Sequence, residues 1–253
     1  MKDETFCVLR FAWKADSRAG IRTTHYEAVT FMRTLTIAWI TLCTLSLSVL
    51  AQTKPLYENN FEKAEVGKVP EDFLVLEGGF AGKEEGGNKF LELPGTPLDS
   101  FAVQFGPAES SNVAVSARIK GAGKGRRFPV FGVGLNGVAG YKLQLSPGKK
   151  LLELYKDQEL KASVAYEWKS GEWTSLRLQI SKTKDGAWKV EGKAWLQGSP
   201  EPAQWLLTAD EKEEPSAGRA SIFGSPYSGT PIQFDDLVVA SLTPQSKSEQ
   251  LIK

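Results

Sequence analysis

Histidine, cysteine and methionine are nearly absent from this sequence. The only histidine is His25, the two cysteines are Cys7 and Cys43, and both methionines precede residue 33. A chain that loses residues 1–51, as argued below, keeps 202 residues and none of these three types. Whatever that chain does, it does without imidazole, thiol or thioether groups.

Each absence excludes a class of chemistry. Without histidine or cysteine there is no Ser-His-Asp or Cys-His nucleophile, and no zinc, copper or haem site built on imidazole or thiolate. Without disulfides, stability has to come from a hydrophobic core, which a chain of this length can build. Carboxylates, hydroxyls, amides, Lys/Arg and aromatics remain. These groups serve carbohydrate recognition, calcium binding and carboxylate-based glycoside chemistry.

A strong net charge is also missing. Residues 52–253 contain 25 basic and 26 acidic side chains, a net charge of −1. Nucleic acids and anionic membranes attract chains with a marked positive charge. The sequence therefore gives no reason to expect a nucleic-acid partner.

One long apolar run is present, at residues 35–50, between Arg33 and Ala51. A positive charge, an apolar stretch and a small residue before the cut are typical of a secretory signal peptide, here residues 32–51. The run is short for a membrane span, which needs about 20 residues. The second interpretation is that this segment stays uncleaved and anchors the chain in a membrane. We expect no other contact with a membrane. We expect export to the periplasm, cell surface or extracellular space.

The ends of the chain are expected to lie outside the fold. Residues 1–31 show no period of either helix or strand, which favours Met32 as the native start and a non-native upstream extension. A long N-terminal region of the signal peptide is the alternative. The polar segment 243–253 is expected to be a flexible tail. One domain, residues 52–242, is left between them.

The sequence pattern of that domain predicts β-structure throughout. Short alternating or β-branched runs are separated by Gly, Pro, Asn and Asp, and no segment has a convincing helical period. Many strands at this spacing predict an all-β, two-sheet antiparallel β-sandwich (jelly roll), closed by its first and last strands. The predicted strands are 55–62, 72–77, 88–93, 100–105, 112–119, 128–135, 138–146, 150–155, 159–165, 172–181, 187–197, 203–208, 218–224 and 231–241.

The turn residues predict three hairpins. Asn136-Gly137 is the strongest signal because both residues tolerate positive φ, and residues 156–158 and 184–186 join two further strand pairs. The run 132–137 matches G-x-G-x-x-G, but a strand rather than a helix follows it, which excludes a dinucleotide site. The basic segment 120–127 is predicted to be a solvated hairpin loop that could touch acidic glycans.

With these strands in place, the chain resembles the concanavalin A-like lectin/glucanase superfamily, which includes laminin-G-like domains. The residues that carry the resemblance are Phe61-Glu62, the hairpin 151–163, the segments 171–178 and 194–205, and Phe234-Asp-Asp-Leu-Val-Val239. The resemblance implies a two-sheet sandwich, frequent sugar binding on a concave face, and often one calcium near the chain termini.

Two kinds of site are predicted. Calcium takes six to eight oxygen ligands, and Asp235 and Asp236 could meet Glu62, Asn60 or Asn59 if the end strands are neighbours. Their alternative role is to bond solvent and backbone N–H groups. Exposed aromatic rings can stack on sugars, and the candidates for carbohydrate binding are Trp195, Trp205, Trp168 and Tyr227. Packing in the core or at an edge is the alternative for these rings, and Trp173 is expected in the core.

The leading hypothesis is an exported, non-catalytic, lectin-like carbohydrate-binding domain with a possible structural Ca²⁺. The alternative is a glycoside hydrolase or lyase with unrecognised carboxylates, and the third is a structural module that docks another protein. A laminarinase-type enzyme would carry a Glu-x-Asp-x-Glu strand, and none occurs here. Glu153, Asp157 and Glu159 share parity, but a turn separates them.

Overall fold

The structure, a computed structural model, describes residues 55–242. The predictions of an upstream extension, a signal peptide and a flexible tail lie outside the described residues. Within them, no helix is long and apolar enough to span a membrane.

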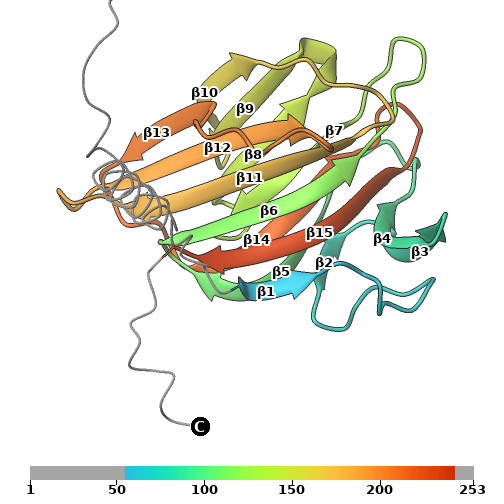
Figure 1. Cartoon of the computed structure of the whole chain (residues 1–253), viewed down its shortest axis with the longest axis horizontal. Coiled ribbons are helices and arrows are strands. Elements are labelled where there is room, and N and C mark those ends of the chain that lie inside the picture. Colours follow the sequence, from blue (N-terminus) through green and yellow to red (C-terminus); the bar gives the residue numbers. More distant parts are fainter. Residues whose placement is uncertain (1–54, 243–253) are drawn as a thin grey trace, which may run out of the picture. The chain divides into compact units, whose positions relative to one another are not determined.

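The described residues form two antiparallel sheets that pack face to face, as Figure 1 shows. The eight-stranded sheet runs in the order β13 (Leu207–Glu211), β12 (Trp188–Leu196), β11 (Trp173–Lys182), β6 (Val113–Lys120), β15 (Ile232–Ser241), β4 (Asn88–Leu93) and β3 (Ala81–Glu85), with β1 (Pro55–Asn59) also paired to β15. The seven-stranded sheet runs β10 (Glu159–Ala165), β9 (Leu151–Lys156), β8 (Tyr141–Ser146), β7 (Val130–Leu135), β14 (Gly218–Ser225), β5 (Phe101–Glu109) and β2 (Leu74–Glu77). A single 3-10 turn, Pro147–Lys149, joins β8 to β9.

The alternation of apolar side chains decides which strand face is buried. In β6 the side chains of Val113, Val115, Ala117 and Ile119 lie in the core, and in β11 those of Leu176, Leu178 and Ile180 do. Side chains alternate between faces along a strand, so the residues between them point away from the core. The predicted all-β sandwich is confirmed, and each sheet has one inner and one outer face.

The first and last strands are neighbours, which is the condition that the predicted calcium ligands required. β1 pairs antiparallel with the second half of β15, with Glu58 opposite Val238, while the first half of β15 pairs with β4. At the change of partner β15 contains an irregularity next to Asp235, and Asp236 has a φ of 50°.

The hairpin predictions are also confirmed. Asn136 and Gly137 have φ of 63° and 77° in the connection between β7 and β8, and Asp157 has a φ of 52° between β9 and β10. Gly186, with φ 89°, turns the chain between β11 and β12.

Two strand predictions needed correction. The strand expected at 203–208 is β13, which begins only at Leu207, opposite Gly192. β3 was not predicted, because its sequence Ala-Gly-Lys-Glu-Glu has no β-branched or aromatic residue. It forms because Gly82 exchanges backbone hydrogen bonds with Gly67 and Lys68 while the strand pairs with β4.

Candidate functional site

The outer face of the seven-stranded sheet is organised in two rows of cross-strand neighbours. Residues directly opposite one another in adjacent strands share a face. The first row is Ala102, Phe223, Gly132, Gln144 and Glu153, and the second is Gln104, Ser221, Gly134, Lys142 and Tyr155. Each row therefore contains a glycine of β7 at its middle position.

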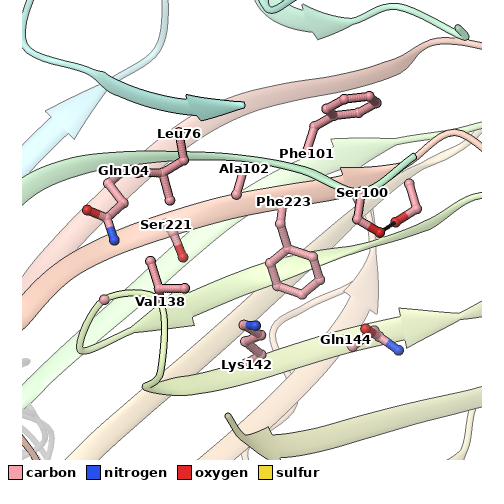
Figure 2. A pocket seen from close by; sticks show the side chains of 12 residues that line it. Leu76, Ser100, Phe101, Ala102, Gln104, Val138, Lys142, Gln144, Ser221 and Phe223 are labelled. Carbon is pink, nitrogen blue, oxygen red and sulfur yellow. Dashed lines mark hydrogen bonds between the residues drawn. The ribbon is translucent and has the colours of Figure 1, made fainter. Parts of the chain in front are cut away.

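A hollow opens on this face between polar side chains, and we name it the β14 pocket. It has a volume of about 210 Å³ and lies on β14 and the strands around it. Figure 2 shows Phe223 near its centre, between Ala102 on one side and Lys142 on the other. Its lining comprises Leu76, Ser100, Phe101, Ala102, Gln104, Gly137, Val138, Lys142, Gln144, Ser221, Phe223 and Ser225.

The lining combines an aromatic ring with hydrogen-bonding groups. The Phe223 ring is half-buried. No side-chain hydrogen bond of Gln104 or Ser221 occurs among residues 55–242, so both groups remain available to a ligand. At one end Ser100 Oγ lies 2.8 Å from Ser225 Oγ and 3.4 Å from Tyr227 Oη. An apolar ring beside amide and hydroxyl groups suits a molecule with both C–H faces and hydroxyls.

Glu153 anchors the polar side chains next to the pocket. Its carboxylate is 2 % exposed and accepts hydrogen bonds from Ser146, from Gln144 at 3.2 Å, from Lys149 at 3.1 Å and from Tyr155 at 3.0 Å. Burial alone would raise the pKa of Glu153, but the hydrogen bonds from Ser146, Lys149 and Tyr155 outweigh it and lower the pKa. The ionised carboxylate thus holds Gln144 in place at the pocket wall.

We expect Glu153 to make stability depend on pH. Because its pKa is lowered in the folded state, its ionised form stabilises the fold fully above the ordinary Glu pKa of about 4.3, and this contribution is lost as the pH falls through the folded-state value. Glu153→Gln should lower the free energy of unfolding by about 1–3 kcal/mol at pH 7. The difference from wild type should shrink in denaturant unfolding at pH 3.

The matched control is Glu159→Gln on the next strand. Glu159 is exposed and pairs with Lys161 at 3.5 Å, and such exposed pairs contribute about 0–1 kcal/mol. A Glu153→Gln effect that is the same at pH 7 and pH 3 would contradict the ionic role of Glu153.

The four predicted sugar-contacting aromatics do not share one face. Tyr227 lies at the end of the β14 pocket, next to Ser100. Trp195 is half-buried on the outer face of the other sheet, opposite Ser175, and Trp205 lies near it with Lys193 Nζ 4.3 Å from its ring centroid. Trp168 packs against the core ring of Phe131. Sugar binding by each of them stays a prediction.

Trp173 corrects another expectation, because it is not in the core. Its ring lies at the edge of Phe90, with the Arg118 guanidinium 4.7 Å from its centroid. Trp173 is therefore part of a packed cluster on the outer face of the eight-stranded sheet, next to the acidic pair of β15.

The predicted calcium ligands have protein partners. Asp235 is 1 % exposed and accepts hydrogen bonds from Arg118 at 2.6 Å, from Asn88 at 2.9 Å and from the Asp236 N–H at 2.7 Å. Burial raises the pKa of Asp235, and the hydrogen bonds oppose that shift. Asp236 lies 3.1 Å from Arg118 Nε. The Arg118 guanidinium therefore already binds both carboxylates, and calcium binding by Asp235 and Asp236 stays a prediction.

The remaining predicted ligands each accept a hydrogen bond from a backbone N–H group. Glu62 accepts the Lys89 N–H at 3.3 Å, Asn60 accepts the Glu62 N–H at 3.4 Å, and Asn59 accepts the Phe61 N–H at 2.8 Å. Among residues 55–242, no group of three or more His, Cys, Asp or Glu side chains is placed to hold a metal ion.

The residues of the β14 pocket were missed from sequence. Gln104, Gln144 and Phe223 belong to three strands that are far apart in the chain, and none forms part of a motif. One signal was present in Gly132-Val-Gly134, where two glycines occupy alternate positions of a strand. Glycine in a strand marks a close approach of backbone or ligand, and here the Phe223 ring and the Ser221 hydroxyl, which line the pocket, lie directly over Gly132 and Gly134.

No protein-family model and no curated protein sequence matches this chain. Solved structures match it in fold. A Bacillus subtilis protein of unknown function with a galectin-like fold aligns with a TM-score of 0.53 at 13% identity, over 75% of this chain and 98% of its own. The metal-free carbohydrate recognition domain of Emp46p aligns with a TM-score of 0.51 at 12% identity, over 75% and 98%. The described chain shares with both structures the fold of a two-sheet antiparallel β-sandwich.

Proposed function

We propose that this domain binds a saccharide in the β14 pocket and does not cleave it. The observation that carries the proposal is the half-buried Phe223 ring, which lies between the unpartnered Gln104 and Ser221 groups on one side and Gln144 on the other. A sugar can place its C–H face on the ring and its hydroxyls against the amides. All of these side chains lie on strands, which hold a binding site more precisely than loops do.

The fold supports the same class of function. The Emp46p domain that shares this architecture is a carbohydrate recognition domain. Fold alone does not imply function, so the argument depends on the side chains of the pocket.

Binding without turnover agrees with the chemistry of the lining. Glycoside hydrolysis normally uses two carboxylates on opposite sides of the scissile bond. The residues that line the β14 pocket include no Asp or Glu. The nearby Glu153 has both oxygens engaged by neighbouring donors.

The test is a glycan binding screen of residues 52–253, followed by Phe223→Ala. Loss of the ring should weaken binding about tenfold, equivalent to about 1.4 kcal/mol, with little change in the melting temperature because the ring borders the pocket. Trp195→Ala, on β12, and Trp205→Ala, in the connection before β13, test the other candidate residues, and both variants should bind as wild type does if the saccharide binds in the β14 pocket.

Three results would overturn the proposal. Binding that fails in the Trp variants and survives in Phe223→Ala would move the site to the eight-stranded sheet. Release of shorter saccharides would establish the hydrolase or lyase alternative. A silent screen together with a specific protein partner would favour the docking module.

Export remains part of the proposal, supported by the sequence of residues 32–51. A structural Ca²⁺ also stays a prediction, although Asp235 already neutralises Arg118. The melting temperature of residues 52–253 measured with calcium and with chelator tests it, and identical values would exclude the metal.

A further inference from the structure

Lys142 is the single charged side chain in the lining of the β14 pocket. It projects from β8 on the outer face, opposite Gly134 on one side and Tyr155 on the other. A Cβ built at Gly134 would lie 3.8 Å from Lys142 Cγ, so the lysine stem lies beside Gly134. Lys142 lines the pocket, and Figure 2 shows its side chain near the Phe223 ring.

The neighbouring lysines of this sheet are paired, whereas Lys142 is not. Lys149 pairs with Glu153 at 3.1 Å, Lys156 with Glu211 at 3.0 Å and Lys161 with Glu211 at 3.3 Å. No ion pair of Lys142 occurs within residues 55–242. Its charge is left for something outside the chain.

The pocket offers no carboxylate to balance that charge. Glu77 and Asp99 are exposed and adjoin lining residues in sequence, but neither lines the pocket. A ligand that covers Lys142 removes water from the ammonium, and this costs free energy unless the ligand supplies an opposite charge. A neutral sugar lying over this position would leave the cation unpaired.

From this geometry we propose that the preferred ligand is an acidic saccharide, with an oxyanion substituent bound at Lys142. The proposal rests on the proposed function of the same pocket. Ser221 and Lys142 flank Gly134, with their Cα atoms two strand spacings, about 10 Å, apart. An oxyanion above Gly134 can accept one hydrogen bond from the Ser221 hydroxyl and one from the ammonium, while the sugar ring contacts Phe223.

The experiment compares acidic oligosaccharides with their neutral counterparts. Uronate-containing oligomers are paired with their methyl esters, and sulfated oligomers with their desulfated forms, so that the two arms distinguish carboxylate from sulfate. Residues 52–253 should bind the acidic member of at least one pair about tenfold more tightly, and the preference should weaken as salt rises. Lys142→Gln should abolish the preference and retain binding of the neutral member.

Lys184→Gln is the matched control, because it removes the same charge from the exposed turn between β11 and β12 and should keep the preference. Equal binding of acidic and neutral members by wild type would overturn this inference and leave saccharide binding standing. A preference that survives Lys142→Gln would also overturn it. No binding of any pair would remove the proposed function and this inference together.

Discussion

Replacing Asp235 with alanine is expected to lower the free energy of unfolding by about 3–5 kcal/mol, because it removes the buried carboxylate from the Arg118 guanidinium and leaves the exposed Asp236 as its carboxylate partner among the described residues. The Asp235 carboxylate is almost fully buried and connects three strands, through Arg118 of β6 and Asn88 of β4. Arg118 also stacks on Trp173, so a displaced guanidinium would disturb that ring. Urea unfolding with an unchanged m-value would measure the loss.

Asp236→Asn is the matched control for this prediction. Asp236 contacts the same guanidinium, but its side chain is 54% exposed, and exposed ion pairs contribute about 0–1 kcal/mol. Asparagine tolerates the positive φ of this position better than alanine would. Equal losses in Asp235→Ala and Asp236→Asn would contradict the assignment of the buried ion pair to Asp235.

Gly132→Ala is expected to cost about 3 kcal/mol or more, or to prevent folding. A Cβ at this position would overlap the backbone oxygen of Leu143 in β8, and the Phe223 ring lies on its other side. Backbone atoms that form a sheet cannot rotate away as a side chain can, so the β7–β8 pairing would have to shift. Overpacking by even one methyl group costs about 1–3 kcal/mol where side chains alone adjust.

Gly134→Ala, two residues further along the same strand, is the control and a second test of the site. Here the Cβ would meet the Ser221 hydroxyl, which can rotate, and would lie 3.2 Å from the Tyr141 backbone oxygen. The stability cost should stay below about 1.5 kcal/mol, while saccharide binding should fall because the methyl group displaces the Ser221 hydroxyl, which lines the pocket. A Gly134→Ala variant that binds as wild type does would place the saccharide elsewhere.

Much of the fold could be predicted because it depends on local signals. The alternation in residues 113–119 and 175–181 reports which face of each strand is buried, and this pattern needs no knowledge of the partner strand. Asn136-Gly137 and residues 156–158 specify hairpins through backbone conformations that few residues adopt. The first and last strands were predicted to close the sandwich, and the structure adds that β1 and β15 pair directly.

The candidate site could not be predicted in the same way. Gln104, Lys142 and Ser221 come from different strands, and only the register of four paired strands places them in one row. The tryptophans attracted attention because they are large, yet their positions put Trp195 on the opposite sheet and Trp168 against the core. The acidic pair of β15 likewise could not reveal Arg118, which lies 117 residues away.

The sequence alone therefore determined the class of architecture, the buried face of each strand and the tight turns. It also determined that residues 52–253 have no histidine or cysteine for catalysis or metal binding. These properties depend on residue type and on near neighbours. The tertiary structure decided which polar side chains share a surface, that Asp235 binds an arginine, and that the pocket residues Phe223 and Ser221 lie over Gly132 and Gly134. Those outcomes depend on the register between strands that are distant in the sequence. A shift of one residue in that register would move each side chain to the opposite face of the sheet.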